Sequence, residues 1–209
     1  MSLEPSHLAP WRSPLARNLY KHRSQPQSRY LQLATVDLTG RPTNRTLVFR
    51  GFVDHLPGQS NLLKFVSDRR TDKIQQLKVN SWAEACWYFP NTREQFRIAG
   101  KISTIDLEQT NPAWQKLRHI AWHDLSDNAR IQFSWCDPGM PLEDSESAKS
   151  LVPETITDPS QPSANFCLLL LDPELVDRLE LRKNPQMRWQ YRKIPAKDAF
   201  TWLSQAVSP

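Results

Sequence analysis

Glycine is scarce in this chain, which has 209 residues and only 5 glycines. Neither a GxGxxG fingerprint nor a P-loop occurs, so the common glycine-rich nucleotide sites are excluded. The nucleophile elbow GxSxG is missing as well. The 3 cysteines are scattered without a CxxC pair, which argues against zinc and for free thiols. His119 and His123 have the i, i+4 spacing of a helical metal pair, but no HExxH signature accompanies them, and no metal is expected.

Long apolar runs are also missing. The longest, FCLLLL at 166–171, has the length of a buried strand and falls well short of the roughly 18 residues that span a bilayer. The N-terminus shows no basic region followed by an apolar block, so no secretory signal is expected. The length fits one domain over residues 1–209. We therefore expect a single-domain cytoplasmic protein with no membrane partner.

Basic residues outnumber acidic ones, which gives a formal net charge of +5. This excess fits either general solubility or an anionic partner, such as a phosphorylated small molecule or a nucleic acid. A binder of single strands needs aromatic side chains that face solvent. Here the aromatics lie in apolar runs such as ACWYF at 85–89, a pattern typical of burial in a core or a subunit interface. We therefore expect no nucleic acid partner.

Short runs of β-formers separated by turn residues predict a mainly β fold, an antiparallel barrel with peripheral helices. Gly40 is expected in the hairpin turn DLTGRP between the first two strands. The strands are expected as two within 29–54 and at 62–68, 82–90, 95–106, 165–183 (broken near Pro173) and 187–195. Helices are expected within 13–25, at 70–80 and twice within 112–135. Residues 136–164, rich in Pro, Ser, Asp and Glu, predict a long loop or a partly disordered insertion, and 199–209 a tail.

Two arginines on one strand raise the question of an anion site. Arg45 and Arg50 flank the apolar centre of NRTLVFRGF (44–52), and strict alternation sends residues five apart to opposite faces. The strand could bulge at Gly51, the site could wrap around the strand's end, or two anions could be bound. Forked guanidinium groups, a hydroxyl and a helix start suit phosphate recognition. Further groups of this kind are Ser67, Arg69, Arg70, Lys73, Gln95, Arg178 and Arg182.

Several of these stretches together resemble a known family. They are RTLVFR (45–50), FVSDRRTDKIQQL (65–77), WAEACWYFPNTREQFRIAGK (82–101), LSDNARIQFSW (125–135) and VDRLELR (176–182). The chain resembles the pyridoxamine 5′-phosphate oxidase-like FMN-binding split barrels, and within them the pyridoxamine 5′-phosphate oxidase-related branch. The resemblance implies an antiparallel split β-barrel that forms a homodimer with FMN at the subunit interface.

The resemblance also implies a set of FMN contacts. The matching positions are Arg45, Thr46, Leu47, Val48, Arg50, Val66, Ser67, Lys73, Gln95 and Arg182. Asp72 replaces a phosphate-binding arginine of the family, and Arg69 or Arg70 is expected to take that role. Arg50 replaces a lysine that lies near both the flavin and the substrate.

The substrate side departs from the family pattern. Ala121, Leu125 and Ala129 stand where the oxidases bind the substrate phosphate, and their side chains cannot do so. Asp172, Gly139 and Met140 fall where the family has a tryptophan and a Gln-Ser pair. The family's Arg-x-His pair is Arg178 and Glu180 here, which leaves these two and Arg50 as substrate candidates.

The leading hypothesis is therefore an FMN-dependent oxidoreductase acting on a small molecule outside the vitamin B6 pattern. The alternatives are a flavin-binding sensor or storage protein without catalysis, and a genuine pyridoxamine 5′-phosphate oxidase. No catalytic residue is assigned, because Arg50 stays charged and His123 is the only candidate base.

Overall fold

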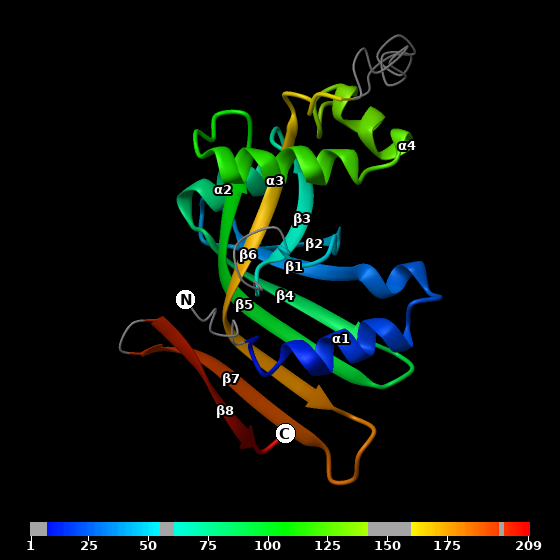
Figure 1. Ribbon diagram of the computed structural model, residues 1–209, viewed down its shortest axis with the longest axis vertical. Helices are drawn as coiled ribbons and strands as arrows, with labels where there is room; N and C mark the ends of the chain where they lie inside the picture. Colours follow the sequence, from blue (N-terminus) through cyan, green and yellow to red (C-terminus); the bar gives the residue numbers. More distant parts are fainter. Residues whose placement is uncertain (1–7, 55–60, 142–159, 197–198) are drawn as a thin grey trace, which may run out of the picture.

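A single antiparallel sheet organises the chain in the computed structural model, which describes residues 8–54, 61–141, 160–196 and 199–209 (Figure 1). The mainly β prediction with peripheral helices is confirmed. The strands are β1 (Tyr30–Val36), β2 (Pro42–Val48), β3 (Leu63–Asp68), β4 (Trp82–Phe89), β5 (Glu94–Ile105), β6 (Phe166–Glu180), β7 (Met187–Ala196) and β8 (Ala199–Val207). The helices are α1 (Arg12–Lys21), α2 (Asp72–Val79), α3 (Pro112–His123) and α4 (Asp127–Arg130), with 3₁₀ turns η1 (Pro26–Arg29) and η2 (Ile131–Ser134). The centre of the expected long loop, 142–159, lies outside the described residues.

The strands follow the order β2-β1-β4-β5-β6-β7-β8, and β3 pairs with β6 beside this path. The β1–β2 turn is closed as predicted by Gly40, whose φ of 87° suits glycine, and by Asp37, which accepts bonds from Thr39 and Arg41. Strand β8 was expected only as a tail. It is a strand because all of Ala199–Val207 pairs with β7, a partner that local sequence does not reveal.

Strand β6 runs almost the full length of the molecule (Figure 1). Its first residues pair with β3 and its last with β7, so it joins the two ends of the fold. The predicted break near Pro173 is wrong, since β6 is continuous there. The irregularity takes the form of a bulge instead: Ala99 pairs with Leu175 and Gly100 with Pro173, so Glu174 of β6 is an extra residue without a partner on β5. A Cβ at Gly100 would stand 2.0 Å from the carbonyl oxygen of Asp172, so only glycine allows this approach.

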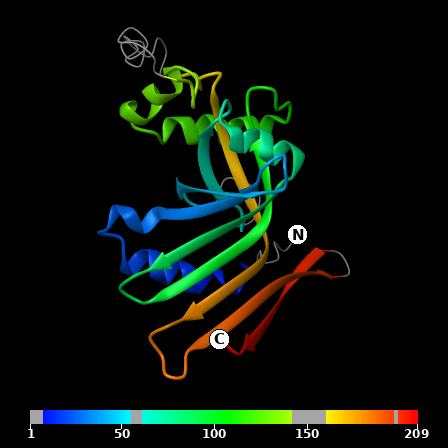
Figure 2. The ribbon, with the colours of Figure 1, turned by 180° about the vertical axis from the view of Figure 1, so that it is seen from behind.

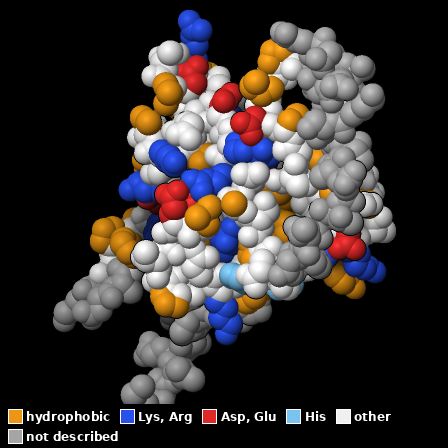
Figure 3. Space-filling model, turned by 90° about the horizontal axis from the view of Figure 1, so that it is seen from above, with side chains coloured by type: hydrophobic (Ala, Val, Ile, Leu, Met, Phe, Trp, Pro, Cys, Tyr) orange, Lys and Arg blue, Asp and Glu red, His pale blue; other side chains and the backbone are white. Residues whose placement is uncertain are grey.

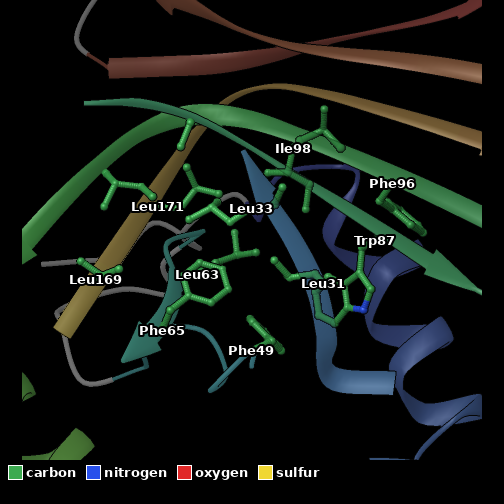
Figure 4. Packing of buried hydrophobic residues seen from close by; sticks show 14 of the residues in the cluster. Leu31, Leu33, Phe49, Leu63, Phe65, Trp87, Phe96, Ile98, Leu169 and Leu171 are labelled. Atoms are coloured by element: carbon green, nitrogen blue, oxygen red, sulfur yellow. The ribbon is translucent and has the colours of Figure 1, made fainter. Parts of the chain in front are cut away.

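Two hydrophobic clusters lie on either side of the sheet. The larger fills the barrel, where side chains from β1, β3, β4, β5 and β6 point toward one another (Figure 4). The smaller lies under α3 and α4 and includes Trp122, Phe133 and Phe166. Of the predicted free thiols, Cys167 is buried, and burial raises its pKa to about 12, whereas Cys86 is half-buried.

The helices are unevenly distributed. Helices α2, α3 and α4 lie at the end where β3 ends and β6 begins, while β7 and β8 extend from the opposite end, as the view from behind also shows (Figures 1 and 2). No helix among the described residues is long and apolar enough to cross a membrane.

Candidate functional site

A cavity of about 320 Å³ opens between strands β2 and β3 on one side and the α3–α4–η2 segment on the other. Six of the predicted FMN contacts line it, namely Thr46, Leu47, Val48, Arg50, Val66 and Ser67. The remaining lining residues are Asp68, Leu125, Ala129, Gln132, Phe133, Trp135 and Pro138. Seen from above, basic and acidic side chains lie next to one another on this end of the molecule (Figure 3).

Arg50 reaches the cavity because the chain wraps around the end of β2. The strand ends at Val48, and Gly51, with a φ of 97°, turns the backbone so that Arg50 and Gly51 pair with Lys64 of β3. Arg50 therefore reaches the cavity around the end of the strand, and a single site served by both Arg50 and Arg45 stays a prediction. Partial desolvation and the nearby charge of Arg29 lower the pKa of Arg50, which favours an anion at this position.

Arg45 does not line the cavity and lies on the α2 side of β2. Its guanidinium donates to the hydroxyls of Thr35 (2.6 Å) and Thr43 (2.9 Å) and to Gln76 Oε1 (3.2 Å). Lys73 lies close enough for the charge of Arg45 to lower its pKa, after the larger effect of burial. Two cations thus lie close together in a half-buried position.

Ser67 connects this pair of cations to the cavity. Lys73 Nζ donates to Ser67 Oγ (3.0 Å) and to Thr71 Oγ1 (2.8 Å), and Ser67 lines the cavity. Among the described residues, neither Arg45 nor Lys73 forms an ion pair with a carboxylate. Hydroxyls and unpaired cations are the donors that a phosphate prefers.

Arg69 and Arg70 differ from this pair because carboxylates already neutralise them. Arg69 pairs with Glu108 at 2.7 Å, and Arg70 pairs with Asp68 at 2.6 Å and with Asp137 at 2.8 Å. Neither arginine lines the cavity. Their contact with an FMN phosphate stays a prediction, and it requires exchange of these partners.

The other predicted contacts lie at the far end of β6. Gln95 pairs with Leu179 across the β5–β6 ladder, and Arg182 is exposed just after β6 ends. Arg178 is 6% exposed and donates to Glu94 Oε2 (2.9 Å) and to Glu180. Its guanidinium also lies 5.1 Å from the ring centroid of Trp189. One chain therefore does not bring these residues to the cavity.

Some of the positions that align with the family's substrate-binding residues line the cavity, and others are buried in the core. Leu125 and Ala129 line the cavity, while Ala121 is buried beneath them. The sequence did not single out Gln132, Phe133, Trp135 or Pro138 as site residues, although three of them lie in the stretch that carried the family resemblance. Gly139 and Met140 line an adjoining cavity, and Asp172 pairs with Lys193.

The described residues offer neither a metal site nor a histidine at the cavity. No group of three or more His, Cys, Asp or Glu residues there could hold a metal ion. His119 is half-buried and His123 is exposed on α3, and neither lines the cavity.

Comparisons with known proteins find relatives over most of the chain. The family model described as "Pyridoxamine 5'-phosphate oxidase, FMN-binding domain" matches residues 8–106. Over 205 residues the chain is 36% identical to pyridoxine/pyridoxamine 5′-phosphate oxidase 2 of Arabidopsis thaliana, covering 98% of this chain and 99% of that one. A solved pyridoxamine 5′-phosphate oxidase-related, FMN binding protein from Nostoc punctiforme PCC 73102 is 48% identical with a TM-score of 0.87, covering 97% and 100% of the two chains. PhzG from Burkholderia lata 383 shares the fold at 18% identity, with a TM-score of 0.71 over 100% and 98%.

Proposed function

Because the chain belongs to the pyridoxamine 5′-phosphate oxidase-like family of FMN-binding split barrels, we propose that it is an FMN-dependent oxidoreductase that acts on a small molecule and holds its flavin between two copies of the chain. FMN is the cofactor of this family and of this chain. The observation that carries the proposal is the meeting of six predicted contact residues in one cavity, beside two cations that lack carboxylate partners.

The FMN phosphate is assigned to Arg45, Lys73 and the hydroxyl of Ser67. Burial and mutual repulsion lower the pKa of Lys73, so a nearby dianion would stabilise both cations in their charged forms. Lys73 already donates to two hydroxyls, which places a donor set of the kind that phosphate needs at one point. Thr46, Leu47, Val48 and Val66 would face the rest of the cofactor.

The length of β6 supports a site shared between two copies. The strand has 15 residues, and at about 3.3 Å per residue it separates the cavity from its far end by roughly 45 Å. A single FMN cannot contact both Ser67 and Arg182 of one chain over that span. If Gln95 and Arg182 bind FMN, a second copy must bring them, which supports a homodimer.

When bound, FMN supplies a hydride acceptor. The chain's own residues would bind and orient the reactants: Arg50 offers a fixed positive charge at the cavity, and residues of the α4–η2 segment form the opposite wall. Asp68 is the one carboxylate among the lining residues, and Arg70 holds it in a bidentate pair. No described lining residue is a histidine, so no general base is assigned.

A described lining without a histidine favours a second candidate, a flavin-binding sensor or storage protein without catalysis. Genuine pyridoxamine 5′-phosphate oxidation is a third, supported by the likeness to the Arabidopsis thaliana protein. Leu125 and Ala129 oppose this third candidate, since neither side chain can hold a phosphate.

The first experiment measures flavin content and mass together. Purified protein should be yellow, with one FMN per chain, and should sediment as a dimer. Colourless protein that also fails to take up added FMN would contradict the cofactor site, and FMN bound to a monomer would contradict the shared site.

A second experiment separates the candidate functions. The FMN-loaded protein is mixed anaerobically with pyridoxamine 5′-phosphate, NADH or NADPH, and loss of the oxidised flavin spectrum is followed. Reduction by pyridoxamine 5′-phosphate would support the oxidase, and reduction by NADH or NADPH a reductase. The binder predicts no reduction by any of the three.

A further inference from the structure

Gln76 of helix α2 lies at the centre of a polar network beside the proposed phosphate site. It is 7% exposed and meets Thr35 of β1 and Thr43 of β2, which are paired across the two strands. Its Oε1 accepts from the hydroxyls of Thr35 (2.6 Å) and Thr43 (3.0 Å). The same oxygen accepts from Arg45 Nη2 at 3.2 Å. One buried amide oxygen therefore joins a helix to two strands.

The donors around Gln76 fix which end of its amide faces Arg45. A guanidinium can only donate hydrogen bonds, so an amide nitrogen at this point would face another donor. The amide oxygen accepts instead, and it does so without carrying a charge. The network is thus built around a neutral acceptor.

The same network fixes the guanidinium of Arg45. Its Nη1 donates to the carbonyl oxygen of Leu33 (3.1 Å) and to Thr35 Oγ1 (2.6 Å). Its Nη2 donates to Thr43 Oγ1 (2.9 Å) and to Gln76 Oε1. Acceptors on three elements hold both terminal nitrogens, so the side chain has little rotational freedom left to lose when a ligand binds.

Neutral acceptors orient Arg45 without cancelling its charge. Burial lowers the pKa of Arg45, and the exposed Asp72 raises it by a smaller effect. Lys73 precedes Gln76 by three residues on α2, and residues with this spacing are neighbours on a helix. A carboxylate at position 76 would therefore pair with Arg45 and lie near Lys73. Glutamine keeps both positive charges available to a phosphate.

We propose that Gln76 is a positioning residue for the cofactor, which holds Arg45 beside Lys73 through an uncharged acceptor and so sets the affinity of the site for the phosphate end of FMN. This inference rests on the proposed flavin site. Gln76 does not line the cavity, and it acts through Arg45.

The main test replaces the amide by a carboxylate of the same shape. Gln76→Glu should raise the FMN dissociation constant about 10- to 150-fold, because the new anion takes over the charge-assisted contact of Arg45 and repels the phosphate. Riboflavin has the same ring system and side chain but no phosphate, and it should bind the variant and the wild type equally. The change in flavin fluorescence on binding to FMN-free protein measures both constants.

Gln75→Glu is the matched control. Gln75 is exposed at the adjacent position of α2, so the same substitution adds the same charge on the solvent side of the helix. It should change the FMN dissociation constant by less than about fivefold. An effect as large as that of Gln76→Glu would overturn the inference.

Riboflavin distinguishes positioning from a merely structural role. Damage to the fold would weaken FMN and riboflavin by the same factor, whereas a misplaced or neutralised Arg45 weakens only FMN. Equal weakening of the two flavins by Gln76→Glu, or an unchanged FMN affinity, would contradict the positioning role. Both copies of a dimer carry the same substitution, so contacts that a second copy brings are common to all variants.

A second set of variants asks whether Gln76 acts through Arg45. Gln76→Met removes the acceptor without adding a charge, should weaken FMN about 2- to 12-fold, and serves if Gln76→Glu does not fold. In an Arg45→Met background the same substitution should have no further effect, because the side chain that Gln76 positions is gone. Additive losses would show that Gln76 acts independently of Arg45 and would overturn the inference.

The wild-type measurements separate failure of the proposed function from failure of this inference. Wild-type protein that binds neither FMN nor riboflavin would refute the proposed function, and this inference with it. Wild-type protein that prefers FMN, together with a Gln76→Glu variant that keeps the same preference, would overturn this inference alone.

Discussion

The two ends of strand β6 hold the same kinds of residue in opposite electrostatic settings. Near its start, Arg45 and Lys73 lie beside hydroxyls and make no ion pair with a carboxylate among the described residues. At its end, Arg178 is enclosed by Glu94 and Glu180. Cations that make no ion pair indicate a site that can bind an anion, and a buried ion-paired cluster indicates a structural role.

The difference has opposite consequences for stability. Half-buried cations that have only neutral hydrogen-bond partners cost free energy until an anionic ligand binds, which is common at functional sites. A matched buried cluster becomes costly only when one member is removed. Substitutions near the start of β6 should therefore change mainly the affinity for FMN. Substitutions at its end should change mainly the free energy of unfolding.

Arg178→Met should have the largest effect. It removes the buried cation between Glu94 and Glu180 and leaves them only the exposed side chains of Arg17 (3.9 Å) and Lys183 (2.8 Å), so the free energy of unfolding should fall by about 3–5 kcal/mol. Urea denaturation measures the loss. Arg97→Met breaks an exposed pair with Glu84 and should cost no more than about 1 kcal/mol; equal losses in the two variants would erase the distinction between the ends.

Gly100→Ala tests the point where the two ends join. The new Cβ would stand 2.0 Å from the carbonyl oxygen of Asp172, and we expect a loss of about 3 kcal/mol in unfolding free energy. Gly40→Ala meets no atom within 4 Å and carries only the strain of its φ of 87°, worth about 1 kcal/mol. Thermal melts of both variants give the comparison, and a harmless Gly100→Ala would mean that β5 can move away from Pro173.

Lys73→Met should act on FMN rather than on folding. Loss of one charge-assisted contact, about 1.5–3 kcal/mol, raises the FMN dissociation constant about 10- to 150-fold. The FMN-free variant should melt at a higher temperature than the FMN-free wild type, because a desolvated cation is removed. Lys78→Met changes an exposed lysine on the same helix and should leave both quantities near wild type. If the FMN-free Lys73→Met variant were less stable than the FMN-free wild type, this lysine would have a structural role like that of Arg178.

The smallest effect is an alkaline pH dependence. The pKa of Lys73 in the FMN-free fold lies below its ordinary value of 10.5, mainly through burial. Between these two pKa values the unfolded chain binds more protons than the folded one, so the contribution of Lys73 to stability rises with pH. The stability deficit of FMN-free wild type relative to Lys73→Met should therefore shrink as pH rises toward 10.5. Denaturation curves at several alkaline pH values measure it, and a constant deficit would contradict the assignment.

Local patterns allowed much of this to be predicted. Thr46, Leu47 and Val48 reach one cavity because they form the end of β2, and Arg50 joins them because the chain turns at Gly51. The predicted break at Pro173 was wrong and strand β8 was missed because both depend on pairing with another strand. Each depends on a neighbouring strand, and local sequence does not say which strand that is.

The sequence by itself determined the β-rich fold, the run of residues along the cavity and the family resemblance that leads to FMN, because all three rest on short-range patterns. Only the tertiary structure decided which arginines are free to bind a ligand. Arg69 finds Glu108 39 residues away in the chain, while Arg70 and Arg178 each combine a carboxylate two residues away with a second one 67 or 84 residues away. Partners this distant are set by how the strands and helices pack, so equal-looking cations acquire different roles.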